Sequence, residues 1–230
     1  MIKLSKGCAP EILTRLAATW TQALLERLGR GETPTDTEKG RYRHPEVKAA
    51  LIEETHGKCA YCESKLRHIT HGDIDHIVPK SVAHEKTFEW ENLTLACDVC
   101  NENKSSHFGH HEDLVDPYTV DPNDHFLFVG PVVLPVPGSD PGLLTERILK
   151  LNRAELIERR QEKIMNLVTQ VSVLARINDP NVRSVVRQSV LETKVDDTQE
   201  FAALTRYCIS ILLEKLDKAE MKQPASIPSV

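Results

Sequence analysis

Two short stretches, Cys59-Ala-Tyr-Cys62 and Cys97-Asp-Val-Cys100, decide the interpretation of this chain. In each, two residues separate the cysteines, which lets both thiolates of a tight turn point at one ion. Two such turns complete the tetrahedral sulfur shell that Zn²⁺ favours. A closed shell of four thiolates has no open position for water, so the zinc is expected to be structural. The alternatives are four unrelated buried thiols, or a thioredoxin-like redox pair, which needs one cysteine pair and a βαβ unit that this sequence does not suggest.

Two segments carry side chains that suit phosphodiester hydrolysis. GDIDHIVPK at 72–80 lies between the two cysteine pairs, and WENLTLACDVCNENK at 90–104 contains the second pair. Phosphodiester hydrolysis needs a deprotonated water and a cation that neutralises charge on the phosphate and the leaving oxygen. His76 titrates near neutrality and is suited to be the general base. Asp75 and the Asn101 amide are oxygen donors that suit Mg²⁺ or Mn²⁺. Lys104, one helical turn after Asn101, would face the same phosphate.

The succession CxxC, DHIxPxS and NLxxxCxxCNxxK resembles the HNH endonucleases in their zinc-ribbon-bracketed ββα-metal form. Neighbouring strand residues point to opposite sides, so Asp75 and His76 can reach one phosphate only if the chain bends there. The resemblance implies a hairpin loop with such a bend. Asn92 matches the residue that holds this loop and orients the histidine, and Asn101 matches the third motif position. Asp73 stays open between a second carboxylate near the cation and a solvated or hairpin-pairing residue.

Helical patterns are expected on both sides of this core. Apolar spacing predicts a helix over residues 11–29, and a second helix is expected over residues 45–57, between a proline and a glycine. The proline-rich part predicts a small hairpin that turns at Gly130–Pro131. Three C-terminal helices are expected over residues 143–177, 181–192 and 198–220. The long apolar stripe of the first could pack within its own bundle or dock a partner.

The predicted fold class is therefore α+β and mostly α: a ββα-metal HNH core with a CxxC/CxxC zinc site, an N-terminal helix and a C-terminal helical bundle. Along the chain we expect an N-terminal helical segment, the nuclease core with its zinc knuckles, a proline-rich connector with a short hairpin, a helical region that docks a partner, and a disordered tail. Their boundaries are 1–57, 58–111, 112–142, 143–220 and 221–230.

The charge of the chain conflicts at first sight with a nucleic-acid substrate. Its 230 residues include 29 basic and 34 acidic side chains, a formal charge of −5, whereas proteins that coat nucleic acid by charge alone are generally basic. Four thiolates (−4) around one Zn²⁺ (+2) would add a further −2. Contact with nucleic acid is therefore expected to be local, with Arg41, Arg43 and His107 as possible contacts, or to be supplied by a partner.

The sequence also bears on location. No apolar run reaches the roughly 18 residues that a membrane span requires. The first residues, MIKLSKGCAPEIL, lack the uninterrupted apolar region of a signal peptide. We therefore expect a cytoplasmic protein with no membrane contact, in a reducing compartment where cysteines more often bind metal than form disulfides.

The wider sequence, including YRHPEVKAALIEETHGKCAYCE at 42–63 and TERILKLNRAELIERR at 145–160, is similar to the PtuB-type HNH proteins of bacterial antiphage defence. That family occurs in Septu systems and beside some retrons, and it acts with an ATPase called PtuA. The resemblance implies an effector nuclease that cuts phage or other invading DNA with a PtuA-like partner. Two alternatives stay open: an RNase that cuts host tRNA in a retron-type abortive-infection system, and a zinc-ribbon binding module without catalysis. The helices from Ile164 onward lie outside this resemblance.

Overall fold

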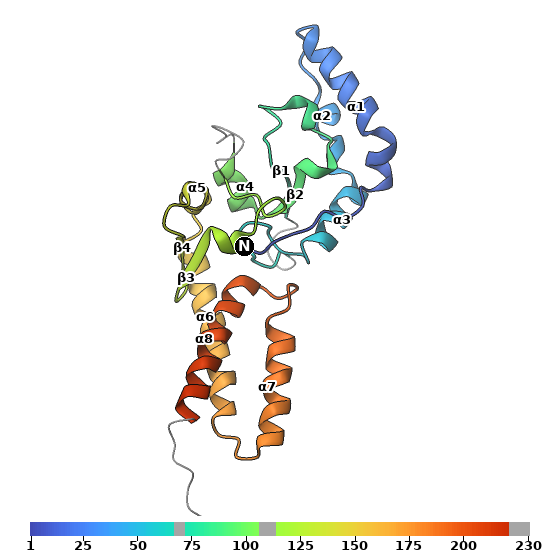
Figure 1. Cartoon of the computed structure of the whole chain (residues 1–230). Coiled ribbons are helices and arrows are strands. Elements are labelled where there is room, and N and C mark those ends of the chain that lie inside the picture. The colour runs from blue at the N-terminus through green and yellow to red at the C-terminus, as the bar shows by residue number, and fades with distance from the viewer. Residues whose placement is uncertain (67–71, 106–113, 221–230) are drawn as a thin grey trace, which may run out of the picture.

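The computed structural model of the chain describes residues 1–66, 72–105 and 114–220. Within them the fold is α+β and mostly helical with two small antiparallel sheets, as predicted (Figure 1). None of the helices in these ranges is both long and apolar enough to span a bilayer. The expected tail, 221–230, lies outside the described residues. The α-helices are α1 (Glu11–Gly29), α2 (Asp36–Lys39), α3 (Pro45–Glu54), α4 (Asp98–Lys104), α5 (Asp140–Ile148), α6 (Ala154–Leu174), α7 (Pro180–Lys194) and α8 (Ala202–Glu220). The strands are β1 (Asp73–His76), β2 (Leu93–Ala96), β3 (Phe126–Val129) and β4 (Val132–Pro135), and short 3₁₀ helices are η1 (Arg41–Arg43), η2 (His84–Lys86), η3 (Trp90–Asn92) and η4 (Pro122–Asp124).

Sheet β1–β2 and helix α4 form the centre of the molecule. β1 pairs antiparallel with β2 from Asp73↔Ala96 to His76↔Leu93, and α4 begins directly after β2. Every residue of β2 is buried, whereas β1 is exposed at Asp73 and buried at His76. The chain bends at residues 77–78, just after β1 ends. The predicted ββα arrangement is therefore confirmed. The bend directly follows His76, the position at which a bend was expected.

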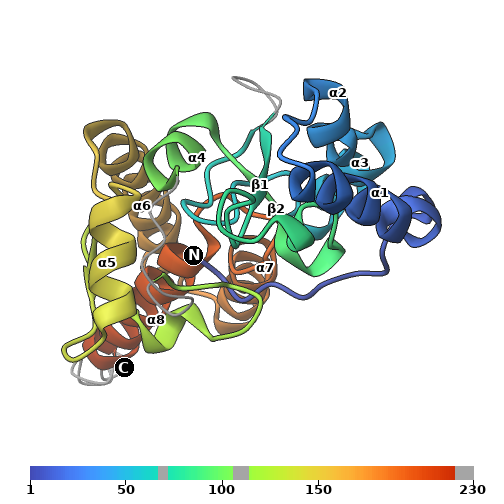
Figure 2. The same cartoon turned by 90° about the horizontal axis from the view of Figure 1, so that it is seen from above.

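Helices α1 to α3 lie to one side of this sheet and α4 to α6 to the other (Figure 2). The predicted helix over residues 11–29 is confirmed as α1, and its Trp20 meets Phe88 edge to face, with ring centroids 5.6 Å apart. Helix α3 ends at Glu54, earlier than the predicted stop at Gly57. The reason is that His56 and Gly57 both adopt positive φ, 55° and 65°, which ends a helix.

The prediction of one continuous helix over residues 143–177 is wrong, because the chain breaks between α5 and α6. Lys150 has a positive φ of 49°. Asn152 uses its amide to pair with β4: Oδ1 accepts from the Val133 N–H at 2.9 Å and Nδ2 donates to the Val133 carbonyl at 2.7 Å. An asparagine that bonds a neighbouring backbone in this way competes with helix formation. The hairpin predicted at Gly130–Pro131 is confirmed as β3–β4.

Helices α6, α7 and α8 form a bundle that extends away from sheet β1–β2 (Figure 1). Leu167, Val171 and Leu174, from the predicted apolar stripe, are buried with Ile209 and Leu213 of α8. This part of the stripe packs within its own bundle, the first of the two alternatives.

The start of α8 is attached to the first cysteine pair. The Phe201 N–H donates to the Glu63 carbonyl at 3.4 Å, and Lys58 Nζ donates to the Gln199 carbonyl at 3.0 Å. One hydrophobic cluster also joins the N-terminal segment, sheet β1–β2 and the first turn of α8. The C-terminal bundle is thus continuous with the core that positions the cysteines.

Candidate active site and metal centres

The four cysteines of the two pairs meet in one place. Their Sγ atoms all lie within 4.8 Å of one another, and those of Cys62 and Cys97 are 3.8 Å apart. A tetrahedral ion with Zn–S bonds of about 2.3 Å places its sulfurs about 3.8 Å apart, so this donor set fits Zn²⁺. Over residues 1–66, 72–105 and 114–220, no other set of three or more His, Cys, Asp or Glu side chains gathers in this way.

Both cysteine knuckles, residues 59–62 and 97–100, are built into the ββα unit. The Ala60 N–H donates to the Leu95 carbonyl of β2 at 2.9 Å, which ties the first knuckle to the sheet. Cys97 caps α4, and its sulfur accepts from the Cys100 N–H at 3.4 Å. One bound Zn²⁺ would therefore hold the first knuckle, β2 and the start of α4 together.

A residue from far along the chain, Arg153, faces the same sulfurs. Its guanidinium N–H groups donate to Cys100 Sγ at 3.7 Å, Cys62 Sγ at 3.9 Å and Cys97 Sγ at 3.7 Å. Four thiolates around one Zn²⁺ carry a net −2, which a guanidinium at this distance partly neutralises. No pattern near the cysteines predicts this contact, because Arg153 lies 53 residues after Cys100, at the break before α6.

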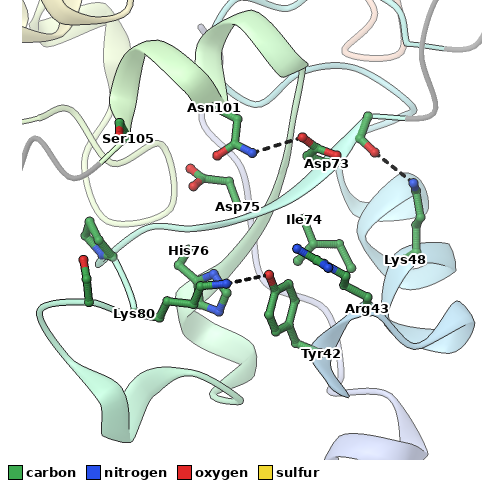
Figure 3. Close-up of a pocket in the computed structure, with 13 residues that line it drawn as sticks. Tyr42, Arg43, Lys48, Asp73, Ile74, Asp75, His76, Lys80, Asn101 and Ser105 are labelled. Carbon is green, nitrogen blue, oxygen red and sulfur yellow. Dashed lines mark hydrogen bonds between the residues drawn. The ribbon is translucent and has the colours of Figure 1, made fainter. Parts of the chain in front are cut away.

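A cavity of about 480 Å³ opens beside β1 and α4. It brings together three of the predicted site residues, Asp75 and His76 from β1 and Asn101 from α4 (Figure 3). Asp75 and His76 are only 6% and 5% exposed, so they lie deep in the cavity, whereas Asn101 is partly exposed. Because β1 ends at His76 and the chain bends there, these two strand neighbours can share one cavity.

The imidazole of His76 is fixed by one hydrogen bond. Nε2 lies 3.0 Å from the Thr87 carbonyl, and because a carbonyl can only accept, Nε2 carries the proton and Nδ1 keeps its lone pair. The Tyr42 ring packs at right angles to the imidazole, with centroids 4.5 Å apart. Burial lowers the pKa of His76 from 6.5 to about 4, below the near-neutral value expected from the sequence. The ring is therefore neutral at pH 7, the state that a general base requires.

Asn92 holds the loop between β1 and β2. Its side chain is buried, its Oδ1 accepts from the Val78 N–H at 2.7 Å, and its Nδ2 donates to the carbonyls of Val78 at 3.0 Å and Lys86 at 3.1 Å. These bonds fix the loop at Val78 and at Lys86, the residue that directly precedes Thr87, the partner of His76. The loop-holding role expected of Asn92 thus has the contacts it requires.

Two donors hold the Asp75 carboxylate. The Tyr61 hydroxyl donates to Oδ2 at 2.7 Å, and Lys104 Nζ lies 3.2 Å from Oδ1 and 3.1 Å from Oδ2. Burial, and then Asp75 itself, raises the pKa of Tyr61 well above its usual value, so the hydroxyl keeps the proton that it donates. Lys104 is 2% exposed and also donates to the His76 carbonyl at 2.6 Å. Instead of standing open to a phosphate, as expected, Lys104 is buried against Asp75 and His76.

The amide of Asn101 is oriented by Asp73. Its Nδ2 donates to Asp73 Oδ2 at 3.1 Å (Figure 3). With the nitrogen directed at Asp73, the amide oxygen stays available as a ligand. Asp73 is exposed and lines the same cavity. The cavity thus holds two carboxylates and one amide oxygen, a donor set that fits Mg²⁺ or Mn²⁺.

Basic side chains that the sequence analysis did not single out line the cavity beside Arg43. They are Lys48 of α3 and Lys80 of the loop after β1. Lys80 Nζ donates to the Tyr42 hydroxyl at 2.9 Å, and Lys48 Nζ donates to the Gly72 carbonyl at 2.8 Å (Figure 3). Lys80 stands four residues after His76 within the motif, and this proximity is the signal that could have found it. No motif in the sequence places Tyr42 near His76, so its contact with the imidazole could not be predicted in this way.

The predicted nucleic-acid contacts are divided by the fold. Arg43 lines the cavity. Arg41 instead lies over the ring of Trp20, 5.7 Å from its centroid, and is not part of the cavity wall. His107 lies outside the described residues. Of the three, only Arg43 is therefore placed beside Asp75 and His76.

One ββα unit thus carries a buried histidine, several oxygen donors and a cluster of four cysteines. Comparison with known protein families supports this description. Residues 59–107 match the model of the HNH endonuclease family. The chain contains an HNH endonuclease domain. This HNH domain includes the histidine, the loop asparagine, the oxygen donors and both cysteine knuckles, whereas Tyr42, Arg43 and Lys48 precede it.

Two curated proteins match about half of the chain. A Septu protein PtuB from Bacillus thuringiensis is 29% identical over 126 residues, which cover 54% of this chain and 45% of that protein. Another from Bacillus mycoides (strain KBAB4) is 27% identical over 150 residues, covering 52% of this chain and 51% of that protein. The chain thus spans about half the length of the curated relatives it matches.

Proposed function

We propose that this protein is a metal-dependent endonuclease that hydrolyses phosphodiester bonds of nucleic acid. The observation that carries the proposal is the neutral His76, whose Nε2–H is committed to the Thr87 carbonyl while its ring lines the cavity shared with Asp75 and Asn101. The HNH domain over residues 59–107 supports the same activity.

His76 acts as the general base. Its Nδ1 takes a proton from a water molecule in the cavity, and the resulting hydroxide oxygen forms a bond to phosphorus. The bond between phosphorus and the leaving sugar oxygen breaks, and a solvent proton neutralises the alkoxide. The Thr87 carbonyl keeps the imidazole in the required tautomer and stabilises the imidazolium, because Nε2–H points at its oxygen.

Asp75 and Asn101 would hold a Mg²⁺ or Mn²⁺ ion, with Asp73 directing the Asn101 amide. When bound, such an ion neutralises charge on the phosphate and on the leaving oxygen. The Zn²⁺ site has no open position, so it supports the fold and not the reaction. Its proposed ligands are Cys59, Cys62, Cys97 and Cys100.

Arg43, Lys48 and Lys80 would bind the phosphates of the substrate, since they line the cavity that contains the base. This local basic wall lets a chain with a formal charge of −5 contact a polyanion at one place. Lys104 is assigned a different task from the one expected: its buried ammonium balances and positions the Asp75 carboxylate.

Cleavage by a His76→Ala variant tests this activity. With saturating Mg²⁺ or Mn²⁺, the variant should cleave plasmid DNA at least about 100-fold more slowly than the wild type, because the general base is gone. Its zinc content and circular dichroism should not change. A matched control is His84→Ala, since His84 is exposed on η2 and does not line the cavity. Wild-type cleavage by His76→Ala would overturn the assignment.

We further propose that this nuclease works in the bacterial cytoplasm as the effector of an antiphage defence system. The two relatives named Septu protein PtuB support this role, and the family resemblance implies a PtuA-like ATPase as the partner. Phage or other invading DNA is the proposed substrate. Capture of DNA by the ATPase would explain why the nuclease itself can be acidic.

The exposed face of α7 is the proposed docking surface for that ATPase. Val182 and Val185 are 50% and 70% exposed there, although the neighbouring stripe of α6 is buried. Val182→Glu and Val185→Glu together should prevent co-elution with the ATPase in size-exclusion chromatography. Val129→Glu is the control, because Val129 is 60% exposed at the turn of the distant hairpin β3–β4. An unchanged complex with the double variant would place docking elsewhere.

The nature of the substrate is tested by giving the nuclease with its ATPase both phage DNA and host tRNA. Cleavage of DNA in this assay would support the proposal. Cleavage of tRNA alone would replace it with the RNase alternative. Binding without cleavage of either would favour a zinc-ribbon binding module.

A further inference from the structure

The first zinc knuckle contains a tyrosine that reaches the proposed cation site. Tyr61 lies between the zinc-ligating Cys59 and Cys62, and its hydroxyl donates to Asp75 Oδ2 at 2.7 Å. Tyr61 is 3% exposed and Asp75 is 6% exposed, so water competes little for this bond. A side chain fixed by the structural metal thus contacts a carboxylate proposed to hold the catalytic one.

Tyr61 reaches Asp75 from behind and not from the substrate side. Asp75 lines the cavity of about 480 Å³ that holds His76, and Tyr61 does not. Tyr61 and Lys104 instead border a different hollow, of which Asp75 is not part. Neither donor to the carboxylate lines the cavity in which a phosphate would bind, so Tyr61 is placed to act on Asp75 and not on the substrate.

Both donors are attached to the zinc knuckles. The first knuckle fixes Tyr61, since the cysteines on each side of it would bind one ion and the Ala60 N–H is bonded to β2. The second knuckle begins α4, the helix that ends at Lys104. The relative position of the two donors, and so the orientation of the carboxylate between them, depends on both knuckles being held together.

We propose that Tyr61 is a positioning residue that fixes the Asp75 carboxylate for the catalytic cation and so couples the zinc knuckles to cation binding. The inference rests on the proposed function, because it takes Asp75 as a cation ligand. Hydrogen bonds that orient a metal ligand typically change metal affinity or activity about 10- to 100-fold when removed. Tyr61→Phe removes the hydroxyl and leaves the buried ring in place.

The test measures Mn²⁺ binding directly, by the electron paramagnetic resonance signal of free Mn²⁺, on the full chain with one Zn²⁺ bound and without nucleic acid. Tyr61→Phe should raise the Mn²⁺ dissociation constant about 10-fold. Saturating Mn²⁺ should restore most of the cleavage rate, because the base and the phosphate contacts are intact. Zinc content and near-ultraviolet circular dichroism, measured on the same samples, restrict the comparison to correctly folded protein.

The matched control is Tyr118→Phe. The Tyr118 hydroxyl also donates to a carboxylate, that of Glu54 at 2.6 Å, and it bonds Thr94 of β2 at 2.9 Å, but it does not touch Asp75. This variant should bind Mn²⁺ like the wild type. Equal weakening in both variants would show a general loss of packing and overturn the role of Tyr61, as would unchanged Mn²⁺ affinity in Tyr61→Phe.

A third variant separates this inference from the proposed function. Asp75→Ala should abolish specific Mn²⁺ binding. If it does while Tyr61→Phe binds normally, the positioning role alone fails. If Asp75→Ala binds Mn²⁺ like the wild type, Asp75 is not a cation ligand, and both the cation site of the proposed function and the inference fail.

Discussion

Lowering the pH should destabilise the protein through His76. Burial in the folded chain lowers the pKa of this histidine from 6.5 to about 4. Between these two values the unfolded chain binds a proton that the folded chain does not, so the free energy of unfolding falls as the pH falls. The stability associated with a neutral His76 is complete above about pH 6.5 and is lost progressively toward pH 4.

The magnitude follows from the two pKa values. A pKa of about 4 against 6.5 corresponds to about 3 kcal/mol in total, at 1.36 kcal/mol for each pH unit. At pH 5 the histidine is almost fully protonated in the unfolded chain and almost unprotonated in the folded chain. About 2 kcal/mol of the loss therefore falls between pH 7 and pH 5.

Urea denaturation of the zinc-loaded wild type and of His76→Gln, at pH 7 and at pH 5, measures this difference. Glutamine keeps an N–H for the Thr87 carbonyl but does not titrate. His76→Gln should lose about 2 kcal/mol less stability between the two pH values than the wild type. Proton binding by the thiolates is common to both proteins and cancels.

His84→Gln provides the control, since this exposed histidine should leave the pH dependence as it is in the wild type. An equal loss of stability in His76→Gln and the wild type would refute the reasoning. It would mean that His76 titrates alike in the folded and unfolded chains and is not held neutral by burial.

Three further outcomes are expected. Asn92→Ala should lower the free energy of unfolding by about 2–4 kcal/mol in urea titrations, because two buried hydrogen bonds and one partly buried hydrogen bond are lost, and should slow cleavage by releasing the loop that holds His76. Arg153→Met should release zinc to a chromogenic chelator about 10-fold faster than the wild type, because the guanidinium no longer offsets the net −2 of the thiolate site. The control is Arg159→Met, since Arg159 is an exposed residue of α6. Brief treatment with a chelator should abolish cleavage reversibly, with Mg²⁺ restoring it, whereas removal of zinc should require harsher treatment and be accompanied by loss of the native circular dichroism signal.

The features that could be predicted from sequence are those set by short spacing. The two residues between each pair of cysteines predicted the gathering of four sulfurs, because the geometry of a tight turn is local. The bend after His76 follows from the need for strand neighbours to share one site. The start of α1 and the hairpin β3–β4 likewise follow from local patterns of apolar residues, proline and glycine.

The features that could not be predicted depend on contacts between distant residues. Arg153 reaches sulfurs that lie 53 to 91 residues earlier in the chain, and no local pattern encodes that approach. The break before α6 follows from the pairing of Asn152 with Val133, which is visible only once β4 is in place. Lys104 is a further example: its position one turn after Asn101 predicted a phosphate contact, because the local pattern does not show what lies beside the helix. The fold instead buries its ammonium against Asp75.

The formal charge of −5 is compatible with the proposed phosphate binding, because the charged residues of the cavity wall are unevenly placed. Inside the HNH domain, the cavity wall contains two carboxylates and only one lysine, Lys80. Arg43 and Lys48 come from the preceding segment, residues 41–54, which packs against β2 through α3. The proposed base and the proposed cation ligands therefore belong to the domain, whereas two of the three basic residues of the cavity wall come from outside it. Under the proposed function, we therefore expect a change of substrate to require changes in that preceding segment more than in the motif.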